Sequence, residues 1–305
     1  MSLFATSIRR VALVFAGLLG AGLSVPTQAA PCTVNCLAPG DYEFTMTWDG
    51  YSREYLVHVP ASYSGSKPVA LTLDLHGHLL TNDDQRGRSG QLAMSDRLGF
   101  IAVWPQGIAT SWNGNNCCTT AYNLQIDDVG FLRQVISTIK ARANIHEDRV
   151  YVTGYSNGGG MTQRMGCQAA DVVRAIAPVA HPLNTDNCHP ARPISVLHFH
   201  GTADTIIPYD GGGEVLPKVI LGVPLGWQGA RQSLAAWKRI LGCSSTLTAT
   251  QLAGASRDET YRQCAQGNST GLVTVADGEH DLYTDTGLPG HVNVAEYIWT
   301  HVFRP

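Results

Sequence analysis

The stretch that most constrains this chain runs from Gly154 to Gly160 and reads Gly-Tyr-Ser-Asn-Gly-Gly-Gly. An apolar run at residues 149–153 precedes it, which predicts a strand, a very tight turn and then a helix. Glycines around Ser156 fit the G-x-S-x-G nucleophile elbow, in which a strained serine needs close neighbours without side chains. We therefore expect the Ser156 hydroxyl to stand exposed above the sheet as a nucleophile. A glycine-rich turn that merely contains a serine is the alternative interpretation.

The length and charge of the chain limit its class. A chain of 305 residues, 44% of them hydrophobic, can form one large core, and α/β folds of this size are commonly a single domain. The formal net charge is -3 and no basic face is evident, so nucleic acid is not an expected partner. We expect a monomeric protein with one domain.

The N-terminus has the features of a secretory signal peptide. Two arginines precede an apolar segment at residues 11–23, and small residues suited to cleavage end at Ala30. The apolar segment is short for a membrane span, and no other segment of the sequence is long enough. We predict a signal peptide at residues 1–30, a mature domain at residues 31–305, and a secreted or periplasmic location without membrane attachment.

The cysteine content suits an exported chain, because disulfides persist in an oxidising compartment, and the sequence has 8 cysteines. Proximity along the chain suggests that Cys167 pairs with Cys188 and that Cys243 pairs with Cys264. The pairing order of the remaining cysteines is open; these are Cys32, Cys36, Cys117 and Cys118. A zinc site is the competing use of clustered cysteines, but the paired C-x-x-C spacing is absent from the sequence. We therefore expect neither a metal nor another cofactor.

Apolar runs and turn residues predict strands that alternate with helices. Strands are expected at residues 41–48, 53–59, 69–75, 100–104, 175–180, 194–199 and 272–275. Helices are expected at residues 88–98, 233–241 and 292–302, and after an N-cap at Asp127 or Asp128. This alternation predicts a mostly parallel sheet with helices on both faces. Residues 106–123 form a loop long enough to suggest a function, and the glycine-rich residues 210–229 are either a lid or a plain connection.

A nucleophilic serine requires an imidazole that accepts its proton and a carboxylate that orients the imidazole. In the elbow architecture these partners follow the serine in the order acid, then histidine. Asp204 and His280 each lie just past a predicted strand, so both should reach the sheet edge that carries Ser156. We predict these three residues as the catalytic set. The less favoured alternatives are Asp210 as the acid and His291 as the base.

The oxyanion of an acyl-transfer intermediate needs two backbone N–H donors. Asn157, at the start of the helix after the serine, should supply the first. The loop after the strand at residues 69–75 should supply the second from His78, with Leu79 as the alternative. Because a backbone group acts there, replacing the His78 side chain should matter less than replacing Ser156.

Three aromatic residues are candidate substrate contacts. Trp112 and Trp227 lie in long loops and could stack on an aromatic acid or a sugar, although a buried anchor is an equally good interpretation of each. Tyr155, beside the serine, is the third candidate. His198 and His200 alternate along a predicted buried strand, and we interpret both as structural residues rather than metal ligands.

With these residues in place, nearly all of the mature chain resembles the secreted esterases of the polyhydroxybutyrate depolymerase and feruloyl esterase group, within carbohydrate esterase family 1 of the α/β-hydrolases. The motifs that together carry the resemblance are Leu-His-Gly at residues 75–77, Trp-Pro-Gln-Gly at 104–107, Asp-Asp-Val-Gly-Phe at 127–131, the elbow, and His-Gly-Thr-Ala-Asp at 200–204. The resemblance implies a disulfide-stabilised α/β-hydrolase fold, the same three catalytic residues and the same two disulfides. One departure is the Asp-Leu-Tyr that follows His280, where family members often have Trp-Pro-Gly.

These features predict a secreted serine esterase that works through an acyl-enzyme without a cofactor. The resemblance implies feruloyl or acetyl esters of plant cell-wall polysaccharide as substrates. Poly(3-hydroxybutyrate), another polyester or hydroxyalkanoate oligomers are the alternative substrates. A non-catalytic binding protein on the same fold and a metal-dependent hydrolase are the alternatives of a different class.

Overall fold

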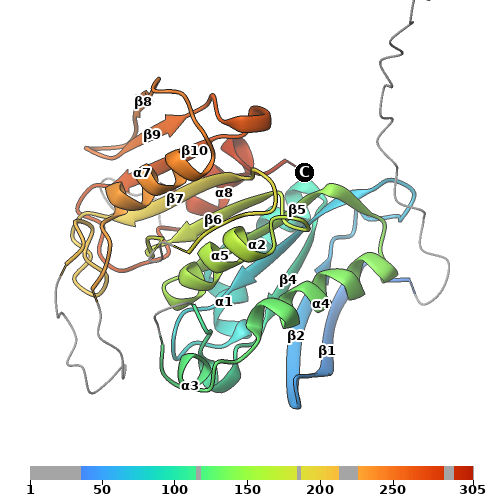
Figure 1. Cartoon of the computed structure of the whole chain (residues 1–305). Helices are drawn as coiled ribbons and strands as arrows, with labels where there is room; N and C mark the ends of the chain where they lie inside the picture. The colour runs from blue at the N-terminus through green and yellow to red at the C-terminus, as the bar shows by residue number, and fades with distance from the viewer. Residues whose placement is uncertain (1–35, 115–117, 184–186, 213–225, 285–291, 305) are drawn as a thin grey trace, which may run out of the picture.

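A sheet of ten strands runs through the part of the chain that the structure describes (Figure 1). This computed structural model describes residues 36–114, 118–183, 187–212, 226–284 and 292–304. The predicted signal peptide and His291 lie outside the described residues.

The strands form a mostly parallel sheet. They are β1 (Gly40–Trp48), β2 (Tyr51–Val59), β3 (Val69–Leu75), β4 (Ile101–Pro105), β5 (Ile145–Tyr155), β6 (Ala175–Val179), β7 (Ser195–Gly201), β8 (Thr248–Gln251), β9 (Arg257–Tyr261) and β10 (Thr270–Val275). Their order across the sheet is β1-β2-β4-β3-β5-β6-β7-β10-β9-β8. The strands from β4 to β10 in this order pair in parallel, and the outer strands on each side pair antiparallel. The predicted parallel sheet is confirmed.

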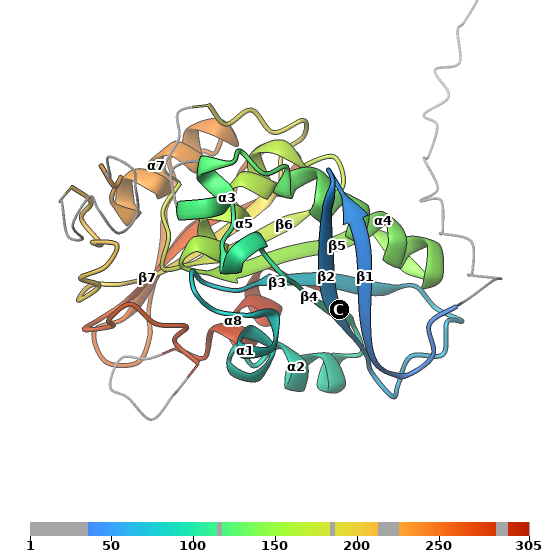
Figure 2. The ribbon, with the colours of Figure 1, turned by 90° about the horizontal axis from the view of Figure 1, so that it is seen from below.

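Helices cover both faces of the sheet. They are α1 (Asn82–Arg88), α2 (Gln91–Leu98), α3 (Thr119–Asn123), α4 (Asp128–Arg142), α5 (Asn157–Gln168), α7 (Ala230–Ile240) and α8 (Val294–His301). Viewed from below, α3, α4, α5 and α7 lie on one face, and α1, α2 and α8 lie on the other (Figure 2). A central strand such as β3 is therefore buried on both sides, which explains its continuous apolar run.

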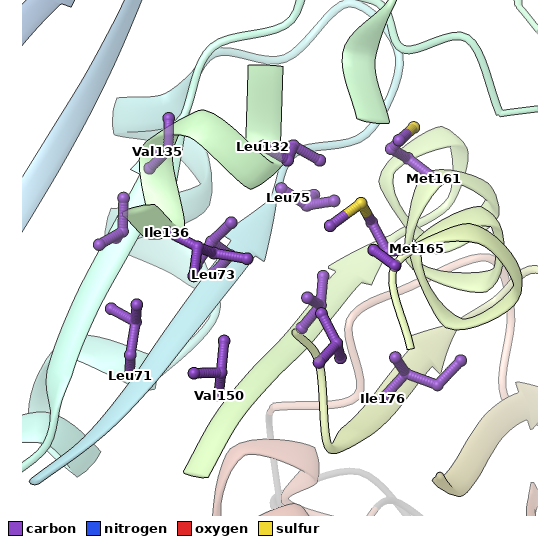
Figure 3. Close-up of a cluster of buried hydrophobic side chains, with 14 of the residues drawn as sticks. Leu71, Leu73, Leu75, Leu132, Val135, Ile136, Val150, Met161, Met165 and Ile176 are labelled. Atoms are coloured by element: carbon purple, nitrogen blue, oxygen red, sulfur yellow. The ribbon is translucent and has the colours of Figure 1, made fainter. Parts of the chain in front are cut away.

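Apolar side chains fill the space between the sheet and each layer of helices. On the face of α4 and α5, leucines of β3 meet apolar residues of both helices (Figure 3); among them are Leu71, Leu73, Leu75, Leu132, Ile136, Met161 and Met165. On the opposite face, the rings of Phe100 and Trp299 stack with centroids 3.9 Å apart. Burying one such side chain contributes about 1.5–3 kcal/mol to the stability of the fold. The two cores therefore hold the ends of the strands, and the loops that follow them, in fixed positions.

The structure differs from the sequence-based prediction of elements in three places. The helix expected at residues 88–98 begins only at Gln91, as α2, because Gly90 has a φ of 75°, and residues 82–88 form a separate helix, α1, that was not predicted. The loop expected at residues 106–123 contains α3 and a short 3-10 turn, Ile108–Thr110. Strand β8 was missed because its side chains are all exposed, so it has no apolar alternation, and its partner β9 was missed with it.

One disulfide connects α5 to the loop after β6, and another connects the segment after α7 to the segment after β9. The bonds Cys167–Cys188 and Cys243–Cys264 are both present, and each closes a loop with a sequence separation of 21. A loop of this length corresponds to about 3 kcal/mol of stabilisation in the chain-entropy account. The pairing of the four N-terminal and mid-chain cysteines stays open, because Cys32 and Cys117 lie outside the described residues. Among the helices that the structure describes, every one is too short or too polar to span a membrane.

Candidate active site

Ser156 lies in the turn between β5 and α5 in a backbone conformation that few residues adopt. Its φ is 53° and its ψ is -118°, which is strained for a residue with a side chain. The Ser156 N–H donates to the Val179 carbonyl at 2.9 Å and holds the turn against β6. A Cβ at Gly154 would come within 2.6 Å of the Gly158 carbonyl oxygen, and one at Gly158 would collide with the Leu75 carbonyl oxygen. The glycines thus permit the close packing that presents the partly exposed serine.

His280 forms hydrogen bonds with both Ser156 and Asp204. Its Nε2 lies 2.8 Å from Ser156 Oγ, and its Nδ1 lies 2.7 Å from Asp204 Oδ2. Because an ionised carboxylate only accepts, Nδ1 carries the proton and Nε2 can accept the proton of the serine hydroxyl. The three residues follow the parallel strands β5, β7 and β10, so they meet at the carboxyl edge of the sheet. The structure therefore brings together the three predicted residues, in the hydrogen-bonded order that a nucleophile, a base and an orienting acid require.

Asp204 is buried, and both of its carboxylate oxygens are engaged. Oδ1 accepts the N–H groups of Ile206 and Ile207 at 2.9 and 2.8 Å. Oδ2 faces His280 and also lies 3.3 Å from Nε2 of His200. Burial alone would raise the pKa of Asp204, but the hydrogen bonds from His200 and His280 outweigh it and hold this pKa well below its usual range. The carboxylate therefore stays ionised at neutral and mildly acidic pH.

The rival assignments are weaker on this geometry. Asp210 is exposed and makes no hydrogen bond to a histidine within the described part of the chain. His291, the alternative base, lies outside the described residues. Asp204 and His280 thus remain our proposed acid and base.

Two backbone N–H groups near Ser156 are the candidate oxyanion donors. Asn157 opens α5, where the helix dipole favours negative charge. The Leu79 N–H donates to the Thr110 carbonyl at 2.9 Å, so it is already engaged. The His78 N–H makes no hydrogen bond among the residues that the structure describes. We therefore keep Asn157 and His78 as the proposed donors and disfavour Leu79.

Trp112 is a buried anchor, which corrects its prediction as a substrate contact. Its side chain has 0% exposure, so it cannot stack on a ligand. Its backbone N–H donates to Asn157 Oδ1 at 2.7 Å, and its carbonyl accepts from Asn157 Nδ2 at 3.0 Å. Its indole N–H donates to the His76 carbonyl at 3.0 Å. Trp112 thereby joins the loop after β4 to the two segments that supply the proposed oxyanion donors.

His76 fixes the end of β3 against the same loop. Its Nδ1 lies 2.8 Å from the Gly77 carbonyl, so Nδ1 carries the proton. Its Nε2 accepts from the Gly107 N–H at 2.9 Å and lies 3.0 Å from Nε2 of Gln106. Burial lowers the pKa of His76 to about 4, so this imidazole is neutral under ordinary conditions. The next histidine side chain, His78, contacts the Thr119 hydroxyl at 3.0 Å and ties the loop to α3.

Tyr155 and Trp227 also act as supports in the structure. Tyr155 is 8% exposed, and its hydroxyl donates to the His280 carbonyl at 2.8 Å. Trp227 is 6% exposed and packs edge-on against His181, with ring centroids 5.1 Å apart. Neither ring offers an open face to a substrate in this structure, so we assign both to support rather than to binding. The lid predicted at residues 210–229 is not tested, because residues 213–225 lie outside the described residues.

A buried ion pair below the site was missed by sequence reasoning. Arg53 Nη2 lies 2.7 Å from Asp128 Oδ1, and both side chains are almost wholly buried. The second Asp128 oxygen accepts the Asn113 N–H at 2.8 Å, so the pair also holds the loop after β4. Asp127, rather than Asp128, is the N-cap of α4. The Asp-Asp motif was the only signal in the sequence, and it did not reveal Arg53 as a partner.

The arrangement has the parts that acyl transfer requires. A partly exposed hydroxyl faces an imidazole, the imidazole faces an ionised carboxylate, and the N-terminus of α5 directly follows the serine. Within the described residues, no group of three or more His, Cys, Asp or Glu side chains is placed to hold a metal ion.

Several known proteins with similar sequences or folds are esterases. No protein-family model matches the chain. Feruloyl esterase B of Piromyces equi is 32% identical over 239 residues, which cover 75% of this chain and 42% of that protein. The probable feruloyl esterase C of Aspergillus terreus is 28% identical over 55% of this chain and 61% of its own length. This chain thus spans less than two thirds of either relative.

Solved structures agree with this relationship at the level of the fold. The ferulic acid esterase of Anaeromyces mucronatus, of the CE1 type, superposes with a TM-score of 0.53 at 15% identity and covers 84% of this chain and 90% of that one. The acetyl xylan esterase of Aspergillus awamori gives a TM-score of 0.55 at 12% identity, with 78% and 94% covered. The chain therefore has the α/β-hydrolase fold of these esterases, and over 75% of its length it is similar in sequence to a feruloyl esterase.

Proposed function

We propose that this chain is a serine esterase that hydrolyses carboxylic esters through an acyl-enzyme. The observation that carries the proposal is the hydrogen-bonded series from Ser156 Oγ through His280 to Asp204, at 2.8 and 2.7 Å. A binding protein that had only kept the fold would not need a serine in a strained turn with its hydroxyl aligned to an imidazole.

The reaction follows from this alignment. Ser156 Oγ attacks the ester carbonyl while His280 Nε2 takes its proton, and the Nδ1–H bond to Asp204 stabilises the imidazolium that forms. The N–H groups of Asn157 and His78 receive the negative charge of the tetrahedral intermediate. His280 then protonates the leaving alcohol, and a water molecule, deprotonated by the same nitrogen, releases the acid from Ser156. Every step uses groups of this chain and needs no cofactor.

The proposed substrates are feruloyl or acetyl esters of plant cell-wall polysaccharide. The names of the relatives support this class, because they include feruloyl esterases and a bifunctional acetylxylan esterase/xylanase. Exposed apolar side chains beside the proposed site give it a surface for an aromatic acyl group: Leu79 follows His78 and is 72% exposed, and Ile206 follows the acid loop and is 38% exposed.

We further propose that residues 31–305 form a single secreted domain that acts as a monomer. The disulfides and the signal-like N-terminus support export to an oxidising compartment. Ester-bearing polysaccharide is then the partner, without nucleic acid or membrane.

The test combines active-site labelling with a turnover panel. A serine-directed organophosphate should label Ser156 stoichiometrically, and Ser156→Ala should abolish both labelling and ester hydrolysis. The panel compares methyl ferulate, acetylated xylan and hydroxybutyrate oligomers. Ester hydrolysis that survived Ser156→Ala would exclude the mechanism, and turnover of only the hydroxybutyrate oligomers would keep the mechanism while replacing the substrate class.

A further inference from the structure

We propose that His200 is a positioning residue that holds the acid Asp204, and that His198 fixes the tautomer of His200 that this role requires. The inference rests on the proposed function, because it concerns how the same catalytic carboxylate is held. Neither histidine touches Ser156, and both would pass for ordinary core residues of β7, with 0% and 1% of their surface exposed.

The hydrogen bonds of His200 define where its proton lies. Its Nε2 is 2.8 Å from the Ile207 carbonyl oxygen and 3.3 Å from Asp204 Oδ2. Carbonyl and carboxylate oxygens only accept, so Nε2 must carry the proton and share it between the two oxygens. His200 thus binds the acid directly and also binds the main chain three residues further on. The imidazole of His200 therefore holds the loop that carries Asp204 at two points.

His198 completes the assignment of the protons. Its Nε2 lies 3.1 Å from His200 Nδ1, and because the His200 proton is on Nε2, His198 must be the donor. Its own Nδ1 is then unprotonated, and this buried atom has no hydrogen-bond partner within the described residues. Burial holds the pKa of His198 well below its usual range, which agrees with a neutral ring. The hydrogen bonds therefore run in one direction, from His198 through His200 to Asp204.

The consequence for catalysis is that Asp204 Oδ2 is held from two sides. His280 donates to it at 2.7 Å and His200 approaches it at 3.3 Å, while backbone N–H groups hold Oδ1. A carboxylate fixed in this way presents one lone pair to His280 and keeps the imidazole aligned with Ser156. Without His200, Oδ2 would lose a hydrogen-bond donor and the Asp204 pKa would rise.

The other titratable groups near Asp204 do not replace this donor. The groups that face it electrostatically from the surrounding elements are His200, His280, His181, Tyr155 and Tyr283. Burial lowers the pKa of His181 to about 4 and raises the pKa of both tyrosines, so these three side chains are neutral at working pH. Of the five, only His200 and His280 donate a hydrogen bond to the carboxylate.

The test replaces His200 in full-length protein and counts active sites with the organophosphate. His200→Phe should lower kcat about tenfold, the scale of one hydrogen bond to a charged group, and leave KM within about twofold. The part of the acid limb of its kcat/KM profile that reflects protonation of Asp204, at strongly acidic pH, should move to higher pH, because the carboxylate is protonated more easily. His200→Gln should restore most of kcat and the original profile, because its amide N–H can reach the same two oxygens.

A second pair of variants keeps the proposal falsifiable if His200→Phe does not fold. His198→Phe removes the donor to His200 Nδ1 and should shift kcat and the acid limb in the same direction but less, whereas His198→Gln should resemble the wild type. Tyr209→Phe is the matched control, because the Tyr209 ring contacts His200 while its hydroxyl bonds to Thr274.

Two results would overturn the proposal. The first is a fully folded His200→Phe protein with unchanged kcat per labelled site. The second is a lower melting temperature in all histidine variants together with an unchanged pH profile of kcat/KM. Either result would leave an active wild type, whereas failure of the proposed function would be seen as an inactive wild type or an active Ser156→Ala.

Discussion

Two groups of loops meet at Ser156, and they contribute to the proposed site in different ways. The loops after β7 and β10 contribute the side chains of Asp204 and His280, which act on the serine through a series of hydrogen bonds. The loop after β3 and the start of α5 contribute the proposed backbone N–H donors, and the loop after β4 packs against both through buried side-chain contacts. We call the first group the triad side and the second the oxyanion side.

The difference between the sides determines what a mutation can reveal. On the triad side, one side chain carries one chemical role, so a near-isosteric replacement should remove activity and spare the fold. On the oxyanion side, buried polar side chains such as Arg53, His76 and Asn157 hold the loops in place through hydrogen bonds. Replacing one of them leaves a buried partner without its hydrogen bond, and this cost falls on stability before it falls on chemistry.

The largest expected effect is on the triad side, from Asp204→Asn. The amide would place an N–H where the carboxylate accepts from His280 Nδ1, so the imidazole would adopt the wrong tautomer and kcat should fall about 10⁴-fold. The melting temperature should change little. Steady-state kinetics with methyl ferulate and a thermal melt measure the two quantities. Asp210→Asn is the control, and loss of activity in this control alone would reverse the assignment of the acid.

The next effect is on the oxyanion side, from Arg53→Met. This change leaves Asp128 buried without its cation, so the free energy of unfolding should fall by about 3–5 kcal/mol, while kcat per labelled site in the folded fraction should stay within a few-fold. Urea denaturation provides the measurement.

An exposed ion pair supplies the matched control for Arg53→Met. Arg133 and Asp171 form a bond of 2.6 Å with both side chains more than a third exposed, and Arg133→Met should change the free energy of unfolding by less than about 1 kcal/mol. Equal losses from the two substitutions would show that burial does not distinguish the two sides as we describe.

The two sides also differ in how far the sequence predicts them. The triad side follows from local patterns: an apolar run ends, a turn begins, and a serine, acid or histidine comes directly after it, as at Ser156 and Asp204. Parallel strands bring such turns to one edge, so the meeting of the residues follows from the fold class. The support of Asp204 by His200 could not be predicted in this way, because it depends on how the chain folds back after β7.

The oxyanion side depends on contacts between segments that are distant in the sequence. Asn157 and Trp112 are 45 positions apart. No local pattern indicates that the side-chain amide of Asn157 forms hydrogen bonds with both the N–H and the carbonyl of Trp112. A tryptophan in a polar loop has the same local sequence whether it is a ligand contact or an anchor, and burial alone separates the two roles. The aromatic substrate contacts were therefore the weakest sequence predictions.

A smaller effect on the oxyanion side concerns Asp74, a buried carboxylate of β3 that accepts from Gln85 and Trp104. Burial raises its pKa from 3.8 to about 6 in the folded protein. Its contribution to stability is therefore complete below pH 4 and is lost as the pH rises through 6, by about 3 kcal/mol in total.

Asp74→Asn isolates this contribution from that of other groups. The advantage of the wild type over Asp74→Asn should shrink by up to about 3 kcal/mol between pH 4 and pH 7, as measured by urea denaturation at each pH. Asp96→Asn, at an exposed carboxylate of α2, is the comparison variant. A difference between wild type and Asp74→Asn that stayed constant over this range would mean that Asp74 titrates normally.

The smallest expected effect concerns Leu79, the exposed residue of the oxyanion loop with a φ of 65°. Glycine removes the strain of the left-handed backbone conformation but increases the conformational entropy of the unfolded chain. Because these two effects oppose each other, Leu79→Gly should change the free energy of unfolding by less than about 1 kcal/mol. If the side chain contacts an aromatic acyl group, Leu79→Gly and Leu79→Ala should both raise KM for methyl ferulate a few-fold and leave kcat unchanged. A fall in kcat with glycine but not with alanine would instead show that a rigid loop is needed to hold the His78 N–H. The oxyanion side would then depend on backbone strain as well as on its buried polar contacts.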